Sequence, residues 1–365
     1  MPSSQPIHHS DATEVIGLVS DPETEPAAEP EAPPKRKRRK RRIILIAVLI
    51  PVLLLGIGGA GVALYLRNVS NNVKRVDAFD SVPAASRPQK DAVAGNAMNF
   101  LLLGSDSRDT QNTDGSRSDT IIVLHLNKDK SAAQLISIPR DTWVYIPKSA
   151  DGQHGGVNSK INAAFAWGGV PLMVQTVEGY TGVRIDHVAL VDFAGFKEIV
   201  DALGGVTINV ETSFTSTHSL NPDGKRHFDK GVQVMDGAAT LDYARERYAF
   251  KDGDFARIRH QQQVIKAILD KASSGGMLSS PTKLNAFLQA TTDTVSVDKT
   301  LNVIDMAAQL RHLRSGNLHF YTSPSKGTGM IGDQSVVLPD TAKAKSLFTA
   351  VRKDDTAAIT SLLAG

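Results

Sequence analysis

The sequence of 365 residues contains no cysteine. This absence excludes disulfide bonds, thiolate catalysis and cysteine-ligated zinc, and it suits an exported domain. No internal repeat is evident, and no low-complexity stretch divides the chain after about residue 98. The sequence also offers no helix-turn-helix candidate before its first long apolar run, which disfavours direct DNA binding. We therefore expect one functional body after that run.

The sequence carries little net charge, with a formal value of +3 at pH 7. An uninterrupted run of eight basic residues, Lys35–Arg42, accounts for the excess, because the rest of the chain has a net charge of about −5. Nucleic-acid binding is one interpretation of such a run. Its position directly before an apolar segment is sufficiently explained by membrane topology and anionic lipid, so no nucleic-acid partner is expected.

Residues 43–66 form an uncharged apolar run. At about 1.5 Å per helical residue the run reaches about 36 Å, enough to cross a hydrocarbon core of about 30 Å. The positive-inside rule then places residues 1–42, a polar tail expected to be disordered, in the cytoplasm. A cleaved signal peptide is a weaker alternative, because the run is long and has no clear cleavage site. We expect a single-pass cell-membrane protein with an extracellular catalytic domain, raised from the membrane by a polar stalk over residues 67–97.

Predicted strands and helices alternate in the remaining chain. The strand candidates are Met98–Gly104, Asp119–Leu126, Ala132–Ile138, His187–Val191, Val206–Val210 and Leu318–Thr322. The helix candidates are Ser159–Ala166, Pro171–Tyr180, Phe193–Leu203, Gly237–Tyr248, Phe255–Ala272, Leu301–Leu313 and Thr341–Arg352. The polar stretch Glu211–Lys230 is expected to form a surface loop or hairpin beside the site.

The predicted fold class is α/β, a three-layer α/β/α sandwich around a mixed central sheet. The sheet is expected to be mixed because Asp119–Leu126 and Ala132–Ile138 are joined too briefly for a crossover helix. The catalytic domain is expected at residues 98–275. Residues 276–365 form a C-terminal extension, which we expect to pack on the same sandwich.

Three pairs of acidic and arginine residues lie at the ends of apolar, strand-like runs. The pairs are Asp106 with Arg108, Arg117 with Asp119, and Arg140 with Asp141. Carboxylate pairs hold hard divalent cations, and guanidinium groups grip phosphate oxygens at two points. Surface salt bridges explain any single pair. Three pairs at strand ends, where open sheets carry their ligand sites, favour a site for a metal-bound phosphate.

A second charged segment lies downstream, where four arginines bracket a turn between two predicted helices. The arginines are Arg245, Arg247, Arg257 and Arg259, and the turn carries Asp252, Gly253 and Asp254. Apolar neighbours indicate that Arg245 or Arg247 points inward, where it needs a carboxylate or phosphate partner. Asp254 is a candidate N-cap of the following helix, whose free amides would favour a phosphate. Alternatively, Asp254 only caps the helix, and the four arginines pair with Glu246, Asp252 and Asp242.

Seven ordered segments between about Asn99 and Lys271 carry a resemblance to a known family. They read NFLLLGSDSR, RSDTIIVLHL, ISIPRDTWV, KINAAFAWGG, DFAGFKEIVDALGGV, GVQVMDGAATLDYARERY and GDFARIRHQQ. In this order they resemble the LytR-CpsA-Psr proteins, membrane-anchored phosphotransferases that attach cell-wall glycopolymers to peptidoglycan in Gram-positive bacteria. The ordered set is far more specific than any one of its motifs.

The resemblance implies a reaction and a set of site residues. A polyprenyl-pyrophosphate-linked glycan would bind, a peptidoglycan hydroxyl would attack the sugar-side phosphorus, and polyprenyl phosphate would leave. By similarity, Asp106 and Asp119 would hold Mg²⁺. The arginines implied to contact phosphate oxygens are Arg108, Arg117, Arg140, Arg245, Arg247 and Arg257. Such a set suits phosphoryl transfer, which depends on positioning and charge neutralisation.

One position departs from the family pattern. The family usually has an arginine directly before its paired glutamines, whereas this sequence has His260 before Gln261 and Arg259 one residue earlier. A shift of one residue turns a helical side chain by about 100°, so Arg259 points in a different direction from an arginine at position 260. Either His260 acts as a shorter donor, with Gln261 beside it, or Arg257 suffices.

The sequence also offers candidates for the catalytic base and for a channel that binds the lipid. Asp106, Asp141 and Asp254 are candidates for the base that takes the hydroxyl proton, and the sequence does not rank them. An apolar channel for the polyprenyl tail is expected between sheet and helices. Its candidate lining residues are Phe193, Phe196, Ile199, Val200 and Leu203, followed by Val264, Ile265 and Ile268. Ordinary core packing explains each of them individually.

Two alternatives to the transferase use the same arginines. One is a membrane-anchored binder or regulator of lipid-linked glycan, and the other is a hydrolase that admits water as the nucleophile. The binder does not require the metal pair Asp106 and Asp119, and both residues are present.

Overall fold

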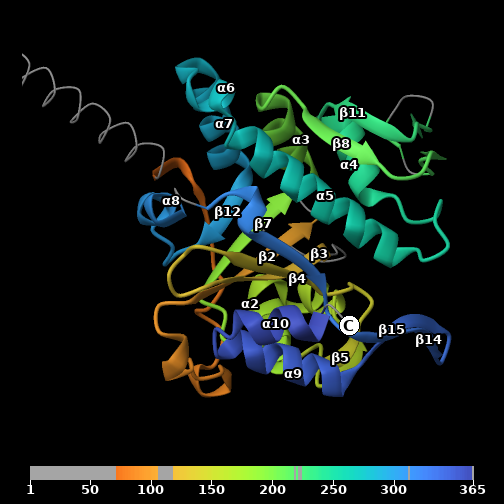
Figure 1. Cartoon of the computed structure of the whole chain (residues 1–365). Coiled ribbons are helices and arrows are strands. Elements are labelled where there is room, and N and C mark those ends of the chain that lie inside the picture. The colour runs from red at the N-terminus through yellow and green to blue at the C-terminus, as the bar shows by residue number, and fades with distance from the viewer. Residues whose placement is uncertain (1–70, 106–117, 218, 221–223, 311–312, 364–365) are drawn as a thin grey trace, which may run out of the picture. The chain divides into compact units, whose positions relative to one another are not determined.

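A computed structural model of the protein describes residues 71–105, 118–217, 219–220, 224–310 and 313–363 (Figure 1). The expected cytoplasmic tail at 1–42 and the expected transmembrane helix at 43–66 lie outside these ranges. Within the ranges, no helix combines the length and the apolar character needed to cross a bilayer.

A seven-stranded sheet lies at the centre of the described domain. Its strands, in spatial order, are β1 (Lys74–Val76), β12 (Val295–Asp298), β7 (His187–Asp192), β2 (Met98–Ser105), β3 (Ser118–Leu126), β4 (Ala133–Ser137) and β13 (Leu318–Thr322). β3 is antiparallel to both β2 and β4, whereas β2 is parallel to β7. The predicted mixed sheet is confirmed.

Helices cover both faces of this sheet (Figure 1). They are α2 (Ala163–Thr181), α3 (Phe193–Ala202), α4 (Gly237–Arg245), α5 (Asp254–Ala272), α6 (Gly275–Leu278), α7 (Pro281–Thr294), α8 (Val303–Leu310), α9 (Thr341–Arg352) and α10 (Thr356–Leu363). Alternate side chains of a strand point to opposite faces. Leu101 and Leu103 of β2 accordingly pack with α2, whereas Leu102 packs with Ile265 of α5. Burial on both faces explains the nearly continuous apolar runs in the sequence.

Four two-stranded sheets flank the central one in the described domain. They pair β8 (Val206–Val210) with β11 (Gly231–Met235), β9 (Phe214–Thr215) with β10 (His227–Phe228), β5 (Trp143–Ile146) with β6 (Val157–Lys160), and β14 (Ser325–Ile331) with β15 (Gln334–Pro339). β8 therefore lies outside the central sheet, and its residues alternate between buried and exposed. The predicted loop or hairpin at Glu211–Lys230 contains the β9–β10 hairpin.

The predicted helix at Ser159–Ala166 is wrong in its first half, because residues 157–160 form β6 and α2 begins at Ala163. We also predicted a separate helix from Pro171, and a kink just before this position does divide α2 into two helical segments. Gly168 and Gly169 have non-helical dihedral angles there, and Gly169 has a φ of 61°, which glycine adopts without a steric penalty. The glycine pair and the proline separate the two apolar patterns that the sequence shows.

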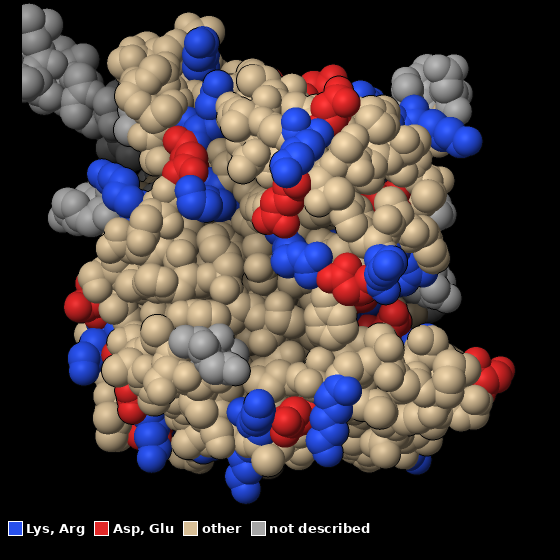
Figure 2. All heavy atoms as spheres, turned by 45° about the vertical axis from the view of Figure 1, so that its right-hand side comes forward, with Lys and Arg blue, Asp and Glu red and all other residues tan. Residues whose placement is uncertain are grey.

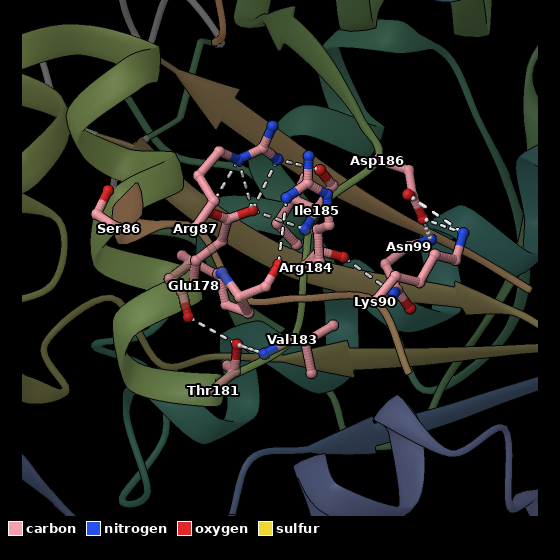
Figure 3. Close-up of polar contacts among 12 residues, drawn as sticks. Ser86, Arg87, Lys90, Asn99, Glu178, Thr181, Val183, Arg184, Ile185 and Asp186 are labelled. Atoms are coloured by element: carbon pink, nitrogen blue, oxygen red, sulfur yellow. Dashed lines mark hydrogen bonds and ion pairs between the residues drawn. The ribbon is translucent and has the colours of Figure 1, made fainter. Parts of the chain in front are cut away.

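The predicted polar stalk is wrong over residues 71–97, which pack on the domain. β1 extends the sheet beside β12, and Val73 and Val76 are buried. Arg87 donates hydrogen bonds to Glu178 of α2 at 2.8 Å and to the Ile185 carbonyl oxygen at 2.5 Å (Figure 3). Residues 71–97 are therefore held against the domain by buried apolar side chains and by the ion pair between Arg87 and Glu178.

The C-terminal extension supplies part of the central sheet. β12 inserts between β1 and β7, and β13 pairs with β4 at the far side of the sheet. Residues that the sequence had placed in an extension are thus built into the same domain as the candidate site.

Candidate active site

Five charged side chains meet at one edge of the central sheet. Asp119 is the second residue of β3, Arg140 and Asp141 follow β4, and Asp254 and Arg257 lie near the start of α5. Because β3 and β4 are antiparallel, the first residues of β3 and the residues after β4 share this edge. The structure therefore brings together Asp119, Arg140, Asp141, Asp254 and Arg257, which we call the ionic cluster.

Ion pairs connect the ionic cluster in a chain. Arg140 pairs with Asp119, and the Arg140 Nε lies 3.7 Å from Asp141 and 3.9 Å from Asp254. Arg257 pairs with Asp254, and its Nη1 lies 3.9 Å from Asp119. The two guanidinium groups thus share two carboxylates, Asp119 and Asp254, and Arg140 also lies near Asp141.

These pairs leave hydrogen-bonding capacity unused. The side chains of Asp254 and Arg257 are 9% and 4% exposed. Even so, no described residue makes a hydrogen bond of suitable geometry to either Asp254 carboxylate oxygen, to Arg140 Nε or to Arg257 Nε. Buried polar atoms normally have partners, and an oxyanion would satisfy the two guanidinium donors. The cluster is therefore suited to binding a phosphate.

Burial shifts the pKa values of two side chains in this cluster. It raises the pKa of the Asp254 carboxyl, although the neighbouring Arg257 and Arg140 oppose the shift. It lowers the pKa of Arg257, while Asp254 acts in the opposite direction. Asp254 is thus more basic than an ordinary aspartate, a property that a proton acceptor requires.

Arg245 and Arg247 lie at the end of α4, beside the cluster. The Arg245 guanidinium is 4.5 Å from the centre of the Phe193 ring, and that of Arg247 is 4.3 Å from the centre of the Tyr248 ring. The sequence offered Glu246, which lies between them, only as an ion-pair partner for the arginines, and the structure gives it another role. Glu246 accepts hydrogen bonds from the backbone N–H groups of Arg247, Tyr248 and Ala249 at 2.9, 2.7 and 3.0 Å.

Glu246 also accepts a hydrogen bond from the Thr217 backbone N–H at 2.5 Å. Its side chain is buried, which opposes ionisation, but these hydrogen bonds outweigh that effect and lower its pKa. Glu246 therefore fixes the turn that carries Arg247. Its position between two arginines was the only available signal in the sequence.

Arg259 and His260 are not brought to the ionic cluster. Arg259 donates to Asp252 at 2.6 Å, and both side chains are well exposed. His260 is buried, with Nδ1 3.1 Å from the Tyr243 carbonyl oxygen and its ring centre 4.2 Å from that of Tyr243. Burial lowers the pKa of His260 to about 4, so the ring is neutral near pH 7. Neither residue takes the place of the family arginine in this structure, and Arg257 is the arginine of α5 that reaches the cluster.

Three predicted site residues, Asp106, Arg108 and Arg117, lie outside the described residues. In the described ranges, no group of three or more His, Asp or Glu side chains could hold a metal alone. Mg²⁺ commonly takes one or two carboxylates together with substrate phosphates. Asp119, which is 19% exposed among the arginines, fits that kind of partial site.

Two hollows adjoin the ionic cluster. The first is an apolar cavity of about 280 Å³, lined at one end by Asp119, Arg245, Arg257 and Gln261. Its apolar lining includes Phe193, Phe196, Ile199, Val264, Ile265 and Ile268, as predicted for a lipid channel. Val200 and Leu203, from the same prediction, instead belong to the core.

The second hollow is a polar cleft of about 1040 Å³ that Arg140, Asp141, Arg247 and Asp254 help to line. The two hollows share no lining residue. Two ion pairs nevertheless connect the hollows. Asp119, which lines the cavity, pairs with Arg140, which lines the cleft. Arg257, which lines the cavity, pairs with Asp254, which lines the cleft. The ionic cluster is therefore a wall between an apolar and a polar compartment.

The distribution of charged residues on the surface bears on nucleic-acid binding. On the face shown in Figure 2, acidic and basic residues lie next to one another, and a broad area toward the left carries neither. Nucleic-acid interfaces typically gather Lys and Arg on one face. The described residues on this face do not form such a patch.

The fold and the ionic cluster define an α/β protein with a charged site at one edge of its central sheet. The model of the LytR_cpsA_psr family matches residues 64–353, and the chain belongs to this family. The resemblance seen in the sequence motifs is confirmed.

Individual relatives agree with this assignment. The polyisoprenyl-teichoic acid–peptidoglycan teichoic acid transferase TagU of Enterococcus faecalis is 33% identical over 285 residues, which cover 78% of this chain and 87% of TagU. The crystal structure of Bacillus subtilis TagV is 28% identical, covers 72% of this chain and 97% of TagV, and superposes with a TM-score of 0.58. TagT bound to LIIa-WTA shares the fold, with a TM-score of 0.58, 24% identity and coverage of 77% of this chain and 99% of TagT.

Proposed function

We propose that this protein transfers a glycopolymer from a polyprenyl-pyrophosphate carrier to a peptidoglycan hydroxyl, forming a phosphodiester link in the cell wall. The observation that carries the proposal is the wall of arginines and carboxylates between an apolar cavity and a polar cleft. Such a wall suits a substrate that is lipid at one end, sugar at the other and pyrophosphate in the middle. The transferase relatives support the same reaction.

The chemistry requires little from the protein beyond placement and charge. The acceptor hydroxyl oxygen bonds to the sugar-side phosphorus, the bond from that phosphorus to the bridging oxygen breaks, and polyprenyl phosphate leaves with the electron pair. Arg140, Arg245, Arg247 and Arg257 would bind the phosphate oxygens and neutralise the charge that develops on them.

Asp254 is our candidate for the base that takes the hydroxyl proton. It lines the polar cleft, and neither of its carboxylate oxygens accepts a well-formed hydrogen bond from a described residue. Its raised pKa brings it closer to the working pH. Asp141 also lines the cleft and, like Asp254, has two cations nearby, with Arg140 at 3.7 Å and Lys160 at 3.9 Å. The deeper burial of Asp254, which raises its pKa, is what favours it over Asp141.

We also propose the cofactor and the location that the sequence predicts. Asp119, together with Asp106, would hold Mg²⁺, which when bound supplies Lewis-acid stabilisation of the phosphate oxygens. The protein would be anchored by residues 43–66, with residues 1–42 in the cytoplasm and the domain outside. The basic run Lys35–Arg42 before the apolar run supports this orientation.

The test uses the full-length protein in detergent, a synthetic polyprenyl-pyrophosphate oligosaccharide, Mg²⁺ and peptidoglycan fragments. Released polyprenyl phosphate and the glycan–peptidoglycan conjugate are followed together. We expect both products, and we expect EDTA or Asp119→Asn to abolish both. Release without conjugate would favour the hydrolase, and tight binding of the lipid without release would favour the binding protein.

A further inference from the structure

The polar cleft is larger than the pyrophosphate alone requires, and its lining comes from parts of the chain that the reaction above does not use. One wall is the β14–β15 hairpin, through Gly327, Thr328, Gln334 and Ser335. Trp167 and Tyr248, from other parts of the chain, also line the cleft. No catalytic or binding residue was predicted in this C-terminal region.

The hairpin is attached directly to the ionic cluster. The backbone N–H of Val337 donates to the Asp141 carbonyl oxygen at 2.8 Å, and Thr142 forms a bridge with Val337. Val336 and Val337 are buried, whereas Thr328, Gln334 and Ser335 are exposed. The hairpin therefore lines the cleft with two buried apolar residues, Val336 and Val337, and with the exposed polar side chains of Thr328, Gln334 and Ser335.

The geometry of phosphoryl transfer decides which substrate enters the cleft. The attacking and leaving oxygens lie roughly in line, on opposite sides of the phosphorus. With the polyprenyl chain in the apolar cavity, its phosphate leaves toward that side of the ionic cluster. The attacking hydroxyl then has to arrive from the opposite side, where the polar cleft lies.

The lining of the cleft suits a carbohydrate. Amide and hydroxyl side chains such as Asn162, Gln334 and Ser335 hydrogen-bond to sugar hydroxyls, and aromatic side chains such as Trp167 offer an apolar face with a polar edge. The volume of about 1040 Å³ is at the upper end of ordinary ligand pockets, so more than one sugar can be accommodated.

We infer that the polar cleft binds the acceptor glycan strand of peptidoglycan, with the β14–β15 hairpin as one wall. This inference rests on the proposed function, because it assigns the lipid-linked donor to the apolar cavity. The hairpin is then a specificity element for the acceptor and makes no contribution to binding of the polyprenyl chain.

The test compares two sets of substitutions on the same hairpin in the full-length protein. Thr328→Ala, Gln334→Ala and Ser335→Ala are combined to remove polar atoms from the cleft. Lys326→Ala and Met330→Ala are combined as the control, because these residues are exposed on β14 but do not line the cleft. Buried Val336 and Val337 are left intact in both variants.

Binding of a synthetic peptidoglycan tetrasaccharide and of a polyprenyl-pyrophosphate oligosaccharide is measured by calorimetry. The cleft variant is expected to bind the tetrasaccharide about tenfold more weakly, while the control variant and the binding of the lipid-linked ligand stay unchanged. Unchanged tetrasaccharide binding would overturn the inference. Loss of affinity for the lipid-linked ligand would assign the cleft to the sugars of the donor and would also overturn it.

Turnover separates this inference from the proposed function. If the wild-type protein releases polyprenyl phosphate and forms conjugate, the cleft variant should raise the KM for the acceptor without lowering kcat at saturation. If the wild-type protein binds the tetrasaccharide through the hairpin but releases no polyprenyl phosphate, the proposed transfer fails while the assignment of the cleft stands.

Discussion

The Nη1 of Arg257 lies 3.9 Å from the Asp119 carboxylate, which joins the start of α5 to the start of β3. Arg259, two residues further along the same helix, instead pairs with Asp252 on the surface. A helix turns by about 100° per residue, so these two arginines face different surroundings. They form a matched pair for testing what the ionic cluster does.

Arg257→Lys is expected to lower kcat/KM for transfer by about 10²- to 10³-fold, because lysine keeps the charge but loses the planar fork that binds phosphate oxygens. Arg259→Lys should change the rate less than about twofold, since an exposed ion pair contributes little. The rates of conjugate formation by the two variants are compared under saturating Mg²⁺. Equal losses in both variants would argue against a phosphate contact by Arg257.

Asp254→Asn tests the proposed base through the pH profile. Because burial raises the pKa of Asp254, the wild-type rate should fall on the acid side as this carboxylate becomes protonated. The asparagine variant should lose about 10²- to 10⁴-fold in kcat, and the acid limb should disappear from the remaining rate. Asp141→Asn serves as the comparison. An unchanged acid limb in Asp254→Asn, together with its loss in Asp141→Asn, would transfer the role to Asp141.

The sequence allowed much of the ionic cluster to be predicted, because apolar runs define strands and antiparallel strands bring their ends together. Asp119, Arg140 and Asp141 follow from that rule. The orientation of His260 does not, because it depends on Phe214 and Tyr243, which stack on the imidazole from other elements. The edge strand β1 was also missed, since three residues carry no periodic pattern.

Glu246 shows a second limit of sequence reasoning. An acidic residue between two arginines reads as a local salt bridge, but its carboxylate binds backbone N–H groups of the following turn. Arg87 and Glu178 are similar, because neither lies in a recognisable motif and their pairing depends on how residues 71–97 fold back. Long-range polar contacts of this kind become visible only in three dimensions.

Arg87→Met should lower the free energy of unfolding by about 3–5 kcal/mol, because it leaves the Glu178 carboxylate buried without its charged partner. The double variant Arg87→Met with Glu178→Leu should recover much of that loss.

Lys90→Met is the control, since the neighbouring Lys90–Asp186 pair spans 3.3 Å and is partly exposed (Figure 3). Its effect should stay below about 1 kcal/mol. Urea denaturation at pH 7 measures all three, and equal effects of Arg87→Met and Lys90→Met would show that residues 71–97 are not held by this ion pair.

His260 gives the domain a predictable acid sensitivity. Its pKa is lowered from 6.5 to about 4 by burial, so the unfolded chain binds a proton between these values and the folded protein does not. Falling pH therefore favours the unfolded state, and the native state should lose roughly 3 kcal/mol between pH 6.5 and 4 through this residue alone.

His260→Phe keeps an aromatic ring among Tyr243, Phe214 and Phe250 but cannot titrate. The difference in unfolding free energy between wild type and His260→Phe should thus shift in favour of the variant as the pH falls from 7 to 4. Phe228→Leu is the control, because Phe228 packs on Phe214 and Tyr243 and not on the imidazole, and its difference from wild type should be independent of pH. A flat difference for His260→Phe as well would mean that the imidazole accepts its proton in the folded domain, and that its environment is more polar than the aromatic cluster implies.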